Sequence, residues 1–108
     1  MAKAPTPPSG SPEDQNARIA MKSIRQEIKR ILDSWDPLSM RGLRGFDMQY
    51  HEFCGPIGVL VRKRVPPIDI AAHLDRLVQQ EWRLPPCREQ CLQIAEKIYR
   101  TGAFLDRA

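Results

Sequence analysis

Apolar residues recur at three- and four-residue spacing in four segments of the chain, and this spacing is the period of an α-helix. The first segment predicts a helix over about Ala17–Ser34. Asp36-Pro37 ends it, because the residue before a proline is disfavoured in the α region. The apolar positions of this first helix are Met21, Ile24, Ile28, Ile31 and Leu32.

The second segment runs from Phe46 to about Arg64 and carries Gly55-Pro56 in its middle. A proline inside a helix removes a hydrogen bond and kinks or breaks the helix. The apolar period continues through the proline, which favours one kinked helix, and two short helices are the alternative. The apolar positions are Phe46, Tyr50, Phe53, Ile57, Leu60 and Val61.

Two double prolines, Pro66-Pro67 and Pro85-Pro86, bound a third helix, and a fourth is predicted over about Cys87–Thr101. Gly102 is a natural residue just beyond a helix end, and Phe104-Leu105 is predicted to fold back onto the core. The apolar positions of the third helix are Ile70, Leu74, Leu77, Val78 and, at its end, Trp82. Those of the fourth are Cys87, Cys91, Ile94, Ala95 and Ile98.

These elements predict an all-α, compact four-helix domain over residues 17–108, with antiparallel neighbours because the connections are short. Residues 1–16 are rich in proline and poor in large apolar residues, so we predict a disordered tail. The chain shows no signal peptide and no run long enough to span a membrane. With three cysteines and no disulfide framework, the expected location is the cytoplasm.

The net charge of +4 is unevenly distributed. Residues 18–45 hold seven Lys/Arg and three Asp/Glu, whereas residues 66–108 hold six of each. Cations on the first helix are spaced four, three and four, which places them on one face, and two arginines follow in the next loop. This predicted basic face comprises Arg18, Lys22, Arg25, Lys29, Arg41 and Arg44. It predicts an anionic partner, although a solvated helix face would show the same pattern.

Other candidate groups favour structural roles. Asp47 and His51 stand one helical turn apart, as a carboxylate and a general base or metal ligand would, but an exposed ion pair has the same spacing. Cys87 and Cys91 could hold a metal, yet they continue an apolar stripe. We therefore expect no catalytic residue, no metal and no cofactor. The side chains of Trp35, Tyr50 and Trp82 are expected in or at the edge of the core, and an exposed Trp35 would instead suit an interface.

The segment Ile31–Pro37, a short glycine-containing loop, Phe46–Tyr50 leading to Pro56-Ile57, and Ile70–Leu74 occur in this order. This order resembles small bacterial domains of unknown function that share a Trp-Asp-Pro corner and a later helix leading to Pro-Ile. The resemblance implies a compact helical fold and no reaction or catalytic residues. Such chains are usually acidic in the loop and second helix, and the arginines of this loop depart from that pattern.

We therefore expect a non-enzymatic protein–protein interaction module that binds a protein with an acidic surface. Nucleic-acid binding through the same basic face is the first alternative. An immunity-type inhibitor of a toxin is the second alternative, although inhibitors of nucleases tend to be acidic and this chain is basic. The sequence predicts neither the identity of the partner nor the oligomeric state.

Overall fold

The computed structural model describes residues 12–106, and the side chains of residues 15–106. Within them the fold is an all-α compact globule of four helices, as predicted, together with short helical segments. The elements are α1 (Pro12–Trp35), α2 (Phe46–Gln49), α3 (His51–Arg62), α4 (Pro67–Arg76), the π-helical turn η2 (Leu77–Glu81), α5 (Arg88–Arg100) and α6 (Ala103–Asp106).

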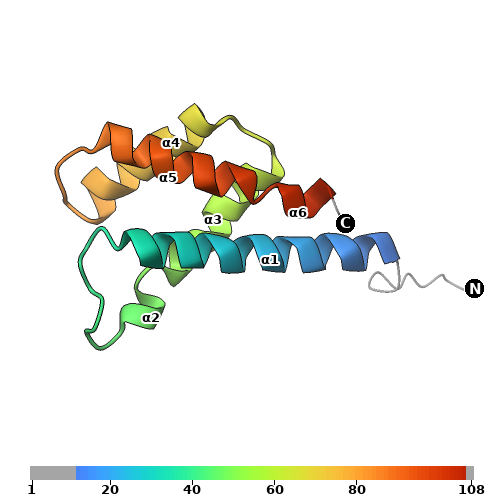
Figure 1. The fold of residues 1–108 in the computed structure, drawn as a ribbon, viewed down its shortest axis with the longest axis horizontal. Coiled ribbons are helices and arrows are strands. Elements are labelled where there is room, and N and C mark those ends of the chain that lie inside the picture. Colours follow the sequence, from blue (N-terminus) through green and yellow to red (C-terminus); the bar gives the residue numbers. More distant parts are fainter. Residues whose placement is uncertain (1–11, 107–108) are drawn as a thin grey trace, which may run out of the picture.

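The long helix α1 forms one side of the molecule (Figure 1). Helices α5 and α6 lie along α1 and run in the opposite direction, α4 packs against α5, and α3 packs against α1. The buried face of α1 repeats every four residues, at Ala20, Ile24, Ile28 and Leu32. These side chains meet those of α3, α4 and α5 in one core, whose fully buried members include Ile57, Ile70, Leu74, Cys91 and Ile98.

Helix α1 begins at Pro12, five residues before the predicted start at Ala17. A proline in the first helical turn loses no hydrogen bond, because the first amide groups of a helix have no partner within it. Of the predicted tail, residues 1–11 lie outside the described part of the chain, and residues 12–16 are helical.

The second predicted helix is bent by 40°, in agreement with the predicted kink. Helix α3 continues through Pro56 from His51 to Arg62, so the chain is not broken there. A separate interruption lies at Tyr50, whose φ of −108° and ψ of 4° part α2 from α3. The side chain of Tyr50 is fully buried. The interruption therefore accompanies the insertion of this ring into the core.

The third predicted helix ends in the π-helical turn, in which the amide of Trp82 donates to the carbonyl of Leu77 at 2.9 Å. On a regular α-helix, each four-residue step turns by about 40° more than a full turn. Ile70 and Trp82 are three such steps apart, so their side chains would point about 120° apart around the helix axis. The wider π turn reduces this drift. Trp82 consequently lies in the core with Leu77 and Val78, at 7% exposure.

Trp82 contacts three aromatic rings edge to face. Its ring centroid lies 5.9 Å from that of Trp35, 5.5 Å from Tyr50 and 5.3 Å from Phe53. Tyr50 is fully buried, and Trp35 and Phe53 are half-buried. This confirms that Trp35, Tyr50 and Trp82 belong to the core or its edge.

The half-buried position of Trp35 predicts a moderate effect of its removal. We expect Trp35→Ala to lower the free energy of unfolding by about 1–3 kcal/mol, less than a fully buried tryptophan, because part of the ring already faces solvent. Urea unfolding followed by far-ultraviolet circular dichroism measures this change. A loss below about 1 kcal/mol would show that the ring contributes little to packing and would favour a role at an interface.

The last described helix, α6, confirms that Phe104 and Leu105 fold back, since both pack against the core cluster. Helix α6 contacts α1, and Arg64 after α3 holds it through an ion pair with Asp106 at 2.6 Å. No helix in the described residues is long and apolar enough to cross a membrane.

Candidate binding surface

Three of the cations on α1 lie beside a depression between α1, α3 and α6. Arg18, Lys22 and Arg25 are exposed on α1, and Arg62 from α3 joins them. The depression has a volume of about 720 Å³, and Ala17, Met21 and Leu105 complete its lining. We call this the basic depression, because every charged residue that lines it is a cation.

Close packing of α1 on α3 places these cations together. Gly58 of α3 is buried, and a Cβ at this position would lie 3.4 Å from Cγ of Arg25 and 3.6 Å from Cε of Met21. The alkyl stem of Arg25 therefore lies over the glycine while the exposed residue keeps its guanidinium at the surface. Arg62 follows one helical turn later on α3.

No ion pair or hydrogen bond engages Arg18, Lys22, Arg25 or Arg62 within the described residues. Other cations are engaged: Arg30 pairs with Glu27 at 3.2 Å and Arg64 pairs with Asp106. Four positive charges around an alkyl floor form a surface that attracts anions, and no neighbouring carboxylate in the lining neutralises it.

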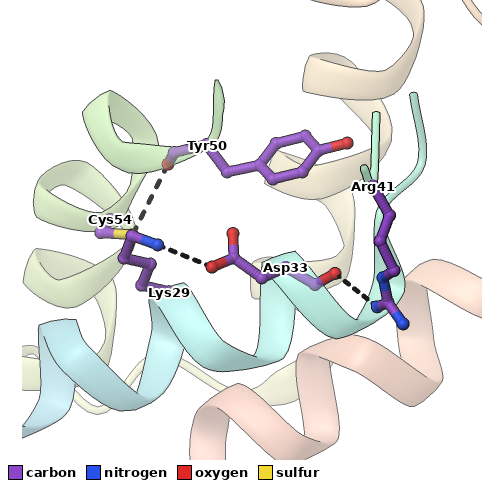
Figure 2. A network of polar contacts seen from close by, with 5 residues as sticks. All are labelled: Lys29, Asp33, Arg41, Tyr50 and Cys54. Carbon is purple, nitrogen blue, oxygen red and sulfur yellow. Dashed lines mark hydrogen bonds and ion pairs between the residues drawn. The ribbon is translucent and has the colours of Figure 1, made fainter. Parts of the chain in front are cut away.

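Lys29 belongs to the predicted face but differs from the cations before it. It is half-buried, and its Nζ lies 2.7 Å from Oδ2 of Asp33, one helical turn further along α1 (Figure 2). Beside it, a second depression of about 450 Å³ between α1 and α3 is lined by Lys22, Arg25 and Lys29 together with His51 and Glu52. This second depression carries both signs of charge, and Lys29 is already paired in it.

Arg41 and Arg44 lie apart from the basic depression, in the loop after α1. The Nη2 atom of Arg41 donates to the carbonyl oxygen of Asp33 at 3.0 Å (Figure 2). It also donates to the carbonyl oxygen of Ser34 at 3.4 Å. Carbonyls at the end of a helix lack partners within the helix and carry partial negative charge, so Arg41 caps α1. Arg44 is exposed in the loop. The six predicted residues therefore do not share one site.

The Trp-Asp-Pro corner is stabilised by the carboxylate of Asp36. Its Oδ1 accepts hydrogen bonds from the Tyr50 hydroxyl at 2.7 Å and the Met40 amide at 2.9 Å, and its Oδ2 accepts from the Arg41 amide at 2.9 Å. The Tyr50 hydroxyl in turn accepts from the Leu38 amide at 3.0 Å. These hydrogen bonds therefore fix the direction of the loop after α1.

Hydrogen bonding and burial shift the pKa values at this corner. Burial raises the pKa of Asp36, but the donors from Met40, Tyr50 and Arg41 outweigh it and leave the pKa below the usual 3.8. Burial, with the neighbouring carboxylate of Asp36, raises the pKa of Tyr50 to about 12. Asp36 is therefore ionised and Tyr50 neutral at pH 7.

The predicted pair of Asp47 and His51 does not lie on one helix. Asp47 belongs to α2 and His51 to α3, on opposite sides of the interruption at Tyr50, and both are exposed. The prediction that they stand one turn apart on a continuous helix was wrong, because the burial of the Tyr50 ring interrupts the helix between them.

The cysteines lie at core positions. Cys54 and Cys91 are buried, and Cys87 is half-buried. Burial raises the pKa of the Cys54 thiol to about 11, and its Sγ lies 3.5 Å from the carbonyl oxygen of Tyr50 (Figure 2). In the described residues no three His, Cys, Asp or Glu side chains gather where they could hold a metal ion.

Arg62 is the member of the basic depression that the predicted face lacked. The sequence signal for it is the cluster Arg62-Lys63-Arg64, but nothing in that cluster indicates which residue faces α1.

A different depression, between α1 and α5, has a volume of about 670 Å³. It carries both signs of charge, with Glu27, Arg30, Glu96 and Lys97 in its lining.

Comparison with protein-family models, curated proteins and solved structures gave no match for this chain. The resemblance to small bacterial helical domains therefore stays a prediction.

Proposed function

We propose that this chain is a non-enzymatic protein-interaction domain whose basic depression binds an acidic, partly apolar segment of a partner protein. One observation carries the proposal. Arg18, Lys22, Arg25 and Arg62 surround the alkyl groups of Met21 and Leu105 and have no partner in the described residues. Such a surface complements a segment in which Asp or Glu flank one apolar side chain.

The dimensions of the depression favour a peptide over a nucleic acid. Arg18 and Arg25 are about 10 Å apart along the axis of α1, which corresponds to about two turns of a helix in the partner. Single-stranded nucleic acids bind surfaces that carry aromatic rings for stacking, and no aromatic residue lines the depression. The floor of the depression is apolar, whereas a bound phosphate group would need hydrogen-bond donors at that position.

The lining also supports a binding role over a catalytic one. The residues that line the depression are Lys, Arg, Met, Leu and Ala, and none of them has the carboxylate, imidazole, hydroxyl or thiol that commonly acts as a general base or nucleophile. These groups bind and orient an anion, so we propose recognition without a chemical step.

A pair of double variants tests this proposal. We expect Lys22→Gln with Arg25→Gln to weaken binding of the partner by about tenfold, equivalent to about 1.4 kcal/mol for two charged contacts. Lys97→Gln with Arg100→Gln is the matched control, because these exposed cations of α5 have the same three-residue spacing. Both variants lower the net charge of +4 by two. Lys29 is unsuitable for this test, because its loss would also leave Asp33 unpaired.

The partner is first isolated on immobilised full-length protein from the source lysate, with and without nuclease, and its affinity for each variant is then measured by isothermal titration calorimetry. The proposal requires a protein that is retained after nuclease treatment and is bound normally by the α5 control. Equal weakening by both double variants would show that only net charge matters. Recovery of nucleic acid, with a linear fall of log affinity against log salt, would make nucleic-acid binding the function.

A further inference from the structure

Two thiols lie side by side where the loop after Pro85-Pro86 enters α5. The Sγ atoms of Cys87 and Cys91 are 3.6 Å apart. The Cys91 amide donates to the Cys87 carbonyl at 2.9 Å, so the two residues are one helical turn apart. Their Cα atoms are then separated by roughly 6 Å, within the range that a disulfide spans. The two sulfur atoms would need to move only a short distance toward each other to form a disulfide bond.

The two thiols differ in exposure in a way that assigns them different roles. Cys87 is half-buried, and Cys91 is fully buried beneath it. Cys87 is the residue that precedes the first turn of α5, and its φ of −142° is not helical. Cys87 is therefore the thiol that an external reagent reaches, and Cys91 is placed behind it.

We propose that Cys87 and Cys91 form a redox-active dithiol that closes to a disulfide by exchange with a low-molecular-weight disulfide such as glutathione disulfide. The Cys87 thiolate attacks one sulfur of glutathione disulfide, forms a mixed disulfide and releases one glutathione thiolate, which takes up the Cys87 proton from solvent. Cys91 then attacks Sγ of Cys87, and the second glutathione leaves with the Cys91 proton. The two cysteines are oxidised, and one glutathione disulfide is reduced to two glutathione molecules.

The position of Cys91 suits the second step. Thiol–disulfide exchange proceeds by attack of one sulfur on another with departure of the third. Cys91 approaches Cys87 from the core, so the glutathione departs on the opposite side, toward solvent. Burial, the hydrogen bond to Cys87 and the charge of Asp75 raise the pKa of the Cys91 thiol to about 12. Cys91 is therefore protonated at pH 7 and reacts poorly with outside reagents, and its attack on the mixed disulfide depends on its Sγ lying 3.6 Å from that of Cys87.

To test this proposal, the full-length protein is incubated with glutathione disulfide, and the products are analysed by intact mass and peptide mapping. We expect the wild-type chain to lose two hydrogen atoms, to form a bond between Cys87 and Cys91 and to leave Cys54 reduced. Cys87 should react at least about tenfold faster than Cys54, because the latter is buried. The Cys91→Ser variant should stop at a stable glutathione adduct on Cys87. The Cys87→Ser variant should form a glutathione adduct more slowly than the wild-type chain, or not at all.

The alternative outcomes are equally definite. A wild-type chain that stops at the mixed disulfide on Cys87 would show that Cys91 does not attack it, and absence of any reaction at Cys87 would show that the pair serves packing alone. Either result overturns the proposal. If Cys91→Ser fails to fold, phenylarsine oxide replaces that variant, because a trivalent arsenical bridges two thiols. One bound arsenical that blocks oxidation supports the dithiol, and no binding to the folded wild-type chain contradicts it.

Discussion

Replacement of Trp82 by alanine is expected to lower the free energy of unfolding by about 3–5 kcal/mol, a large part of the stability of a small domain. Trp82 is 7% exposed and packs edge to face against Trp35, Tyr50 and Phe53. These rings come from α1, from the junction of α2 and α3, and from α3. Alanine would leave a cavity bordered by three separate segments, and each of these segments would lose packing contacts.

Trp82→Phe separates the packing of the ring from its polar group. The Nε1 atom of Trp82 is buried and has no hydrogen-bond partner among the described residues. Phenylalanine keeps an aromatic ring and removes this unpaired donor, so we expect a loss below about 1.5 kcal/mol. Urea unfolding of both variants, with near-ultraviolet circular dichroism of the aromatic cluster, measures the difference. Equal losses for alanine and phenylalanine would contradict the role of the aromatic contacts.

Replacement of Asp36 by alanine is expected to lower the free energy of unfolding by about 2–4 kcal/mol. The substitution removes the acceptor of three hydrogen bonds, from Met40, Arg41 and the buried hydroxyl of Tyr50. It also places alanine at a φ of 46°, in the left-handed region that aspartate and asparagine tolerate better. Both effects act at the same corner, which is why the expected loss exceeds that of an ordinary surface residue.

Asp36 also gives stability a definite pH dependence. Its pKa is lower in the folded chain than the usual 3.8, so its contribution is fully present above that value and is lost as the pH falls through the folded pKa. Asp36→Asn lacks this titration and still tolerates the positive φ. We expect the difference in unfolding free energy between wild type and Asp36→Asn to be larger at pH 7 than at pH 3. A difference that is the same at both pH values would contradict the lowered pKa of Asp36.

The local patterns along the chain predicted most of the helices correctly. The four-residue spacing of Ile24, Ile28 and Leu32 is a property of one segment, and the proline corners restrict only their neighbours. The helix boundaries near Arg62 and Cys87 therefore follow from short stretches of sequence. The same reasoning missed the interruption at Tyr50. The Tyr50 hydroxyl accepts a hydrogen bond from the Leu38 amide and donates one to Asp36, so its position depends on residues twelve or more positions earlier in the chain.

The candidate site was predicted only in part. The exposed cations Arg18, Lys22 and Arg25 are visible as a helical stripe. Their grouping with Arg62 depends on the packing of α1 against α3 at Gly58, and a stripe on one helix carries no information about the neighbouring helix. Likewise, the local spacing of Arg41 gave no sign that it caps α1.

Helical period, proline corners and charge are properties of residues close together in the chain, so they were enough to predict an all-α domain with a basic first helix. Three other features became visible only in the folded chain: the contacts of Trp82 with three rings, the 3.6 Å distance between the sulfurs of Cys87 and Cys91, and the place of Arg62 beside the cations of α1. These arrangements depend on the side-chain orientations and on contacts between segments. Packing of the whole core selects those contacts, and no short window of sequence specifies them.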